Sequence, residues 1–128
     1  MLQYLTYYNP KGYNKERRDG VRIIKTTTYK KSFNKNLVKK HLIKEIDRID
    51  NIEELITNSE NMQELITNPL HIIYGIDKKQ GELKEIYTAK VNDKLRLWMK
   101  PVGEYPYNLV EITDIEFLQI DNKHYGEG

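Results

Sequence analysis

The order in which the hydrophobic period changes along the chain most constrains its fold. β-branched residues crowd the segment VRIIKTTTY at 21–29, which predicts a strand. From Phe33 to about Asp50 the apolar residues recur in steps of three to five, which predicts an amphipathic helix. Alternation returns at 83–91, 94–100 and 107–120, where we expect a hairpin with a turn at Asn92-Asp93 and then a long strand that can contain a bulge.

Helices gathered between strands in this order favour an α+β fold. We therefore predict an N-terminal strand and helices packed on a mainly antiparallel sheet of about four strands. A chain of 128 residues suits a single domain over 1–128. Within it, residues 1–20 form a tyrosine-rich extension, interpreted as an extra edge strand or a loosely ordered segment.

An eight-residue phrase occurs twice, as NIEELITN at 51–58 and NMQELITN at 61–68. In each copy an Asn precedes a Glu by three positions, a spacing typical of a capped helix start, so Asn51 and Asn61 are predicted N-caps. Ten residues do not complete whole helical turns, so the copies predict two short helices or one kinked helix. Two units this short exclude a solenoid.

Composition excludes several classes of protein. No apolar run is long enough to cross a bilayer and the first residues lack a signal-peptide pattern, so we expect a cytoplasmic protein without a membrane partner. The chain has no cysteine, no glycine-rich phosphate loop and no nucleophilic serine elbow. The three histidines lack metal-ligand spacing, so neither a metal nor another cofactor is predicted.

Positive charge is concentrated in the first 50 residues, which hold 13 Lys and Arg against 5 Asp and Glu. Such an excess suits a phosphate backbone, although a basic helix face can also be merely solvated. The candidate RNA-binding residues are Lys39, Lys40, Lys44, Lys84, Lys94 and His71.

Three segments together resemble the RelE/ParE superfamily of bacterial toxins, particularly its HigB-like and YoeB-like members. They are NPLHIIYG from Asn68, GELKEIYTAKVNDKLRLWMKP at 81–101, and DNKHY at 121–125. The order of elements matches over about residues 21–125, and residues 1–20 have no recognised counterpart. The resemblance implies the toxin of a type II toxin–antitoxin system, with a cognate antitoxin, the ribosome and messenger RNA as partners.

The resemblance also implies a chemistry and its residues. Ribonucleases of this family cut messenger RNA on the ribosome without a metal, by attack of a ribose 2′-hydroxyl on the adjacent phosphate. Arg96 matches the family's hairpin arginine and would hold the phosphate, and Lys90 would be a second cation. His124 would donate the leaving-group proton, and Tyr125 would stack on a base or orient the phosphate.

One departure from the family weakens the nuclease hypothesis. Asn68 stands where YoeB-like toxins have a catalytic glutamate, and an amide is not a general base at neutral pH. Glu85 or Asp121 could replace it, or charge stabilisation alone could drive the reaction. Two alternatives therefore stay open, a ParE-like gyrase inhibitor and a plain protein-interaction module. DNA breaks with intact RNA would select the first, and harmless expression would favour the second.

Overall fold

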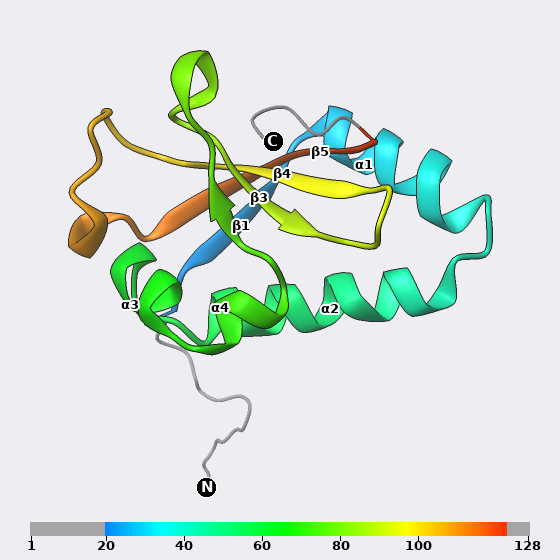
Figure 1. Cartoon of the computed structure of the whole chain (residues 1–128), viewed down its shortest axis with the longest axis horizontal. Helices are drawn as coiled ribbons and strands as arrows, with labels where there is room; N and C mark the ends of the chain where they lie inside the picture. Colours follow the sequence, from blue (N-terminus) through cyan, green and yellow to red (C-terminus); the bar gives the residue numbers. More distant parts are fainter. Residues whose placement is uncertain (1–19, 123–128) are drawn as a thin grey trace, which may run out of the picture.

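The computed structural model describes residues 20–122, which form one sheet with its helices (Figure 1). The elements in chain order are β1 (Arg22–Lys25), α1 (Thr27–Phe33), a π-helical turn η1 (Asn34–Val38), α2 (Ile43–Thr57), α3 (Met62–Thr67), α4 (Leu70–Ile73), β2 (Asp77–Lys78), the 3₁₀ turn η2 (Gly81–Leu83), β3 (Tyr87–Lys90), β4 (Arg96–Pro101), the 3₁₀ turn η3 (Leu109–Glu111) and β5 (Asp114–Asp121). The N-terminal extension lies outside the described residues except for Gly20.

The sheet has five strands in the order β1-β5-β4-β3-β2, with β1 parallel to β5 and all other pairs antiparallel. The predicted α+β class and mainly antiparallel sheet are confirmed. The unpredicted fifth strand, β2, has only two residues and leaves little pattern in the sequence. Arg22 in β1 donates from Nε and Nη2 to the Asp114 carboxylate in β5, and these hydrogen bonds hold the pKa of that carboxyl below its ordinary value.

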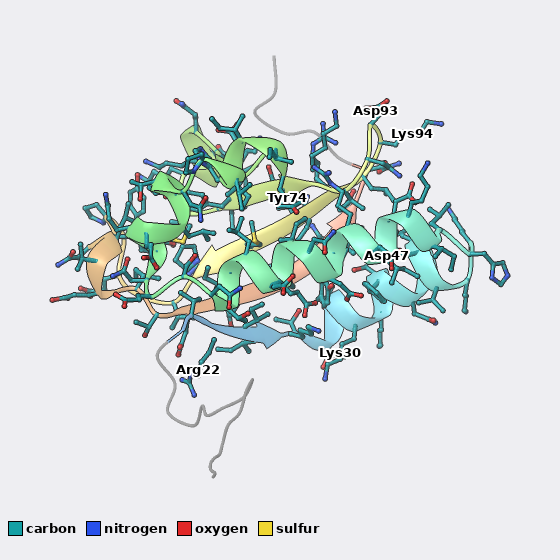
Figure 2. The ribbon with its side chains drawn as sticks, turned by 90° about the horizontal axis from the view of Figure 1, so that it is seen from below. Arg22, Lys30, Asp47, Tyr74, Asp93 and Lys94 are labelled. Atoms are coloured by element: carbon teal, nitrogen blue, oxygen red, sulfur yellow. The ribbon has the colours of Figure 1, made fainter. Side chains whose placement is uncertain are left out.

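One face of the sheet carries the hydrophobic core. Figure 2 shows α2 in front of this face, with α1 beside it. Ile52 and Ile56 of α2 are fully buried, as are Leu97 of β4 and Phe117 of β5. The pairing of β4 with β5 skips Leu118, because Trp98 pairs with Gln119 and Met99 with Phe117. This irregularity is the bulge expected in the last strand.

The strand predicted over 21–29 is too long. It ends at Lys25, because Thr26 caps a helix that the β-branched composition does not predict. The Thr26 hydroxyl accepts a hydrogen bond from the Tyr29 amide at 3.0 Å and donates to the Phe117 carbonyl at 2.9 Å. A capping side chain therefore overrides strand propensity.

The continuous helix predicted from Phe33 to Asp50 is also wrong, since the chain breaks before α2. His41 adopts a left-handed φ of 55°. Its amide donates to Val38 O, and the Leu42 amide donates to Leu37 O, both at 3.0 Å, which is the Schellman pattern of a helix end. Glycine usually occupies such a position, so the histidine concealed the break.

The two copies of the repeated phrase differ in role. Asn61 is the predicted N-cap, since its side chain accepts from the Glu64 amide at 2.8 Å. Asn51 is not a cap, because it lies inside α2. The apolar stripe continues through Ile49, Ile52 and Ile56, so tertiary packing carries the helix past the local cap. The phrase therefore forms the end of a long helix and then a short one.

The predicted strands at 83–91 and 107–120 begin later than expected. A 3₁₀ turn over Gly81–Leu83 precedes β3, and Gly81 has a φ of +65°. Another 3₁₀ turn over Leu109–Glu111 precedes β5. Within residues 20–122, no helix has both the length and the apolar character needed to cross a bilayer.

Candidate functional site

The sheet face opposite the core carries a row of charged residues. Lys90 of β3 pairs with Arg96 of β4, and Arg96 pairs with Asp121 of β5. Residues directly opposite each other in antiparallel strands share a face, and neighbours along a strand alternate. Since Leu97 is buried in the core, Arg96 projects on the other side, as the sequence pattern indicates. The row therefore places two cations side by side.

A hollow of about 440 Å³ lies beside this row. Its wall includes both cations, Lys90 and Arg96, together with His71 from α4, Asp77 from β2 and Thr88 from β3. The structure thus brings together three residues predicted separately from sequence. Two cations and an imidazole on the wall of one open hollow suit a phosphate-bearing ligand, because guanidinium and ammonium groups bind phosphate oxygens.

The tip of the hairpin orients Arg96. Its Nη1 donates to the carbonyl of Asn92 at 2.8 Å and to that of Leu95 at 3.2 Å. Asn92 in turn accepts at Oδ1 from the amides of Lys94 and Leu95, and its Nδ2 donates to Glu45 of α2 at 2.9 Å. Figure 2 shows Asp93 and Lys94 at this tip. The turn predicted at Asn92-Asp93 therefore holds the Arg96 guanidinium group in one orientation.

Helix α4 supplies His71 because the chain turns sharply on both sides of it. At its start, the Asn68 side chain accepts from the Leu70 amide at 2.9 Å. At its end, the Gly75 amide donates to Ile72 O and the Ile76 amide to His71 O, a second Schellman pattern. Gly75 has a φ of +61°, and a Cβ there would lie 3.0 Å from the Lys90 Cβ. The glycine therefore permits α4 to approach β3.

Arg48 of α2 holds α4 and β3 together. Its Nε donates to Lys90 O at 2.6 Å and its Nη2 donates to Ile73 O at 2.9 Å. The guanidinium carbon lies 5.0 Å from the centre of the Tyr74 ring, which Figure 2 places beside α2. The Lys90 amide also donates to Tyr74 O at 2.8 Å. One side chain thus joins α2, α4 and β3.

We expect Arg48→Ala to lower the free energy of unfolding by about 2 kcal/mol, because two charge-assisted hydrogen bonds to backbone carbonyls are lost. Arg48→Lys should recover little of this loss, since one ammonium cannot reproduce the guanidinium fork. Urea denaturation measures both. Lys44→Ala, at an exposed position on the same helix, is the control and should change stability by less than about 0.5 kcal/mol. Equal stability of the two alanine variants would contradict the proposed role of Arg48.

The remaining predicted RNA-binding lysines separate into different places. Lys40 and Lys94 lie with Lys35 along a second hollow of about 540 Å³, near the end of β5. Lys44 lines another hollow beside Arg48. Lys39 is exposed at the end of η1. Lys84 lies away from these, with its ammonium 5.3 Å from the centre of the Tyr105 ring.

Several other predicted site residues are not brought into the hollow. His124 and Tyr125 lie outside the described residues. Of the two carboxylates suggested as bases, Glu85 pairs with Lys100 at 3.6 Å, and Asp121 lines the second hollow. Within residues 20–122 there is no group of three or more His, Cys, Asp or Glu side chains able to hold a metal ion.

Sequence reasoning missed Thr88, Asp77 and Lys35. Thr88 precedes Lys90 by two positions and so shares its face, a signal that strand alternation already contained. Asp77 belongs to a strand too short to recognise, and the place of Lys35 depends on the break at His41. No local sequence pattern indicates that Asp77 or Lys35 lines a hollow.

Comparison with known proteins shows which solved structures have a similar fold. No family model and no curated protein matches the sequence. Among solved structures, the chain is similar to YafQ from E. coli strain BL21(DE3), with a TM-score of 0.53 and 20% identity over 84% of this chain and 94% of that one. It is also similar to a chain of the E. coli DinJ-YafQ toxin-antitoxin complex, with a TM-score of 0.55 and 20% identity over 80% and 92% of the two chains.

A histidine-to-glutamine variant of E. coli YafQ gives a TM-score of 0.55 and 21% identity, covering 84% of this chain and 94% of that chain. Identities this low establish the fold, and nearly the whole of each YafQ chain is covered. The resemblance found in the sequence is therefore confirmed at the level of architecture. The chain has the fold of E. coli YafQ.

Proposed function

We propose that this protein is the toxin of a toxin–antitoxin pair and that it cleaves messenger RNA on the ribosome. The observation that carries the proposal is the hollow beside Lys90 and Arg96, on the sheet face opposite the core of a YafQ-like fold. A cognate antitoxin is the expected partner because a structural neighbour is a toxin-antitoxin complex. The protein would act in the cytoplasm.

In the proposed reaction a ribose 2′-oxygen attacks the adjacent phosphorus, and the bond to the 5′-oxygen breaks. The products are a 2′,3′-cyclic phosphate and a 5′-hydroxyl. Arg96 stabilises the charge that grows on the phosphate oxygens, and Lys90 adds a second cation. His124 supplies the proton to the departing 5′-oxygen, and Tyr125 stacks on a neighbouring base.

Lysines beyond the hollow would extend the RNA path. The second hollow, with Lys35, Lys40 and Lys94, shares the β3–β4 hairpin with the first. Cations spaced along a groove bind a phosphate backbone without reading its sequence. Lys39 and Lys44 add charge from the neighbouring helices, and Lys84 contacts RNA outside the two hollows. We assign these lysines to binding and not to the chemical step.

Induced expression without the antitoxin tests the proposal. Growth should stop, messenger RNA should shorten at defined positions, and chromosomal DNA should stay intact. Co-expression of a cognate antitoxin should restore growth. Growth arrest with broken DNA and full-length messages would instead identify a gyrase-directed toxin of the same fold. Undisturbed growth at verified levels of folded protein would favour a plain interaction module.

A further inference from the structure

The hollow already contains a group that can act as general base. We propose that His71 takes the proton from the ribose 2′-hydroxyl, an inference that rests on the proposed RNA cleavage. It fills the role left vacant by Asn68, three residues earlier in the chain.

Hydrogen bonding fixes the proton arrangement of the His71 ring. Its Nδ1 lies 2.8 Å from the carbonyl oxygen of Asn68. A carbonyl oxygen can only accept, so Nδ1 must carry the hydrogen of this bond. In a neutral imidazole, a protonated Nδ1 leaves Nε2 with its lone pair. Nε2 is therefore the ring nitrogen able to accept a proton from a ligand.

The backbone also holds His71 in place. Its amide donates to Asn68 O at 2.9 Å, and its carbonyl accepts from the Ile76 amide at 3.0 Å. The ring is partly buried and forms part of the wall of the hollow that contains Lys90 and Arg96. The backbone thus holds the imidazole on the same wall as the two cations, where a general base for a bound nucleotide is required.

Asn68 holds the His71 ring in place. Its Oδ1 accepts from the Leu70 amide, and its carbonyl holds the His71 ring. Residue 68 thus positions a base and does not serve as one. The other acid on the wall, Asp77, is exposed, with its carboxylate 3.8 Å from the ammonium of buried Lys79. The Asp77 carboxylate is therefore held by an ion pair.

The proton balance of the step is complete. His71 Nε2 takes the 2′-hydroxyl proton as the 2′-oxygen bonds to phosphorus. The 5′-oxygen then leaves with a proton from His124, the acid of the proposed function. His71 finishes as imidazolium and gives its proton to water, and His124 regains a proton from water. Nothing is oxidised or reduced.

Single-turnover cleavage of messenger RNA on ribosomes tests the assignment. His71→Ala should cut at least about 100-fold more slowly, the usual contribution of a general base. The wild-type rate should depend on pH and fall toward acid, because a protonated imidazole cannot accept a proton. Asp77, Lys90 and Arg96 are the charged residues that share the hollow with His71. In the variant, the His71-dependent part of the fall should disappear.

Added imidazole distinguishes a base from a merely structural residue. It should restore part of the rate of His71→Ala, because the small molecule can occupy the space and take the proton. His71→Gln, which keeps side-chain bulk without a proton acceptor of this kind, should be equally slow and unaffected by imidazole. Thermal melting of each variant checks its fold. The matched control is His41→Asn, since His41 is exposed at a left-handed turn that asparagine tolerates.

The outcomes separate the two proposals. Wild-type protein that leaves RNA intact would overturn the proposed function and this inference together. Cleaving wild-type protein with His71→Ala at the wild-type rate would overturn the inference alone. So would a slow, folded His71→Ala variant that imidazole does not rescue and whose pH profile is unchanged. If the alanine variant does not fold, the pH profile of His71→Gln decides.

Discussion

Replacing Arg96 with alanine should lower the rate of messenger RNA cleavage by about 100- to 1000-fold while the protein stays folded. Losses of that size follow removal of one group that stabilises charge in the transition state. Arg96 stands between Lys90 and Asp121 on the sheet face opposite the core, and its Nη1 donates to a carbonyl at the hairpin tip. The guanidinium is therefore preorganised, which increases its electrostatic contribution.

Arg96→Lys should fall between the wild type and the alanine variant, because it keeps the charge and loses the planar fork. Arg22→Ala is the matched control, since Arg22 is an exposed arginine in β1 that pairs with Asp114. Its cleavage rate should be unchanged. Melting curves must accompany the rates, because the Arg96 contacts with Asn92 and Leu95 also contribute about 1 kcal/mol of stability. A folded Arg96→Ala variant that cleaves at the wild-type rate would contradict the site.

The largest effect on stability is expected from Phe117→Ala, at about 3–5 kcal/mol. Phe117 is fully buried, and its ring meets that of Tyr29 edge-on with the centroids 5.3 Å apart. Its carbonyl also accepts from the Thr26 hydroxyl at the start of α1. The residue therefore joins β5 to the first helix, and a cavity there cannot close without moving both.

Chemical denaturation measures this loss. Phe117→Leu should cost less than Phe117→Ala, because leucine keeps a large apolar side chain in the core and leaves a smaller cavity. Val110→Ala is the surface control, at 60% exposure, and should change stability by less than about 0.5 kcal/mol. A loss below about 1 kcal/mol for Phe117→Ala would mean that the contact between α1 and β5 is not a main part of the core.

Sequence patterns predicted the fold where local and tertiary preferences agree. Asn61 caps α3 because the residues that follow it in α3, Met62 and Leu65, face the core. At Asn51 the same local pattern fails, because the apolar stripe of α2 continues past it. At His41 the left-handed turn carries no glycine. Those two failures arise from tertiary packing and from an atypical residue at a helix end.

Some positions in the candidate site could be predicted from the sequence and others could not. Strand alternation predicts that Arg96 and Lys90 face away from the core, because their neighbours Leu97 and Ala89 are apolar. His71 joins them only because Gly75 turns the chain and Arg48 fastens α4 to β3. Contacts between residues so far apart in sequence leave no local pattern. Which nitrogen of the His71 ring carries the proton depends on one carbonyl, that of Asn68. This too could not be predicted from the sequence.

The chemistry of the RNA ends tests the central claim most directly. Purified protein is mixed with programmed ribosomes and a defined message, and the ends of each cleaved fragment are determined. Attack by a ribose 2′-hydroxyl predicts a 2′,3′-cyclic phosphate on the upstream fragment and a 5′-hydroxyl on the downstream fragment. Intact message, or fragments with 5′-phosphates and 3′-hydroxyls, would contradict the mechanism built on Arg96 and its neighbours.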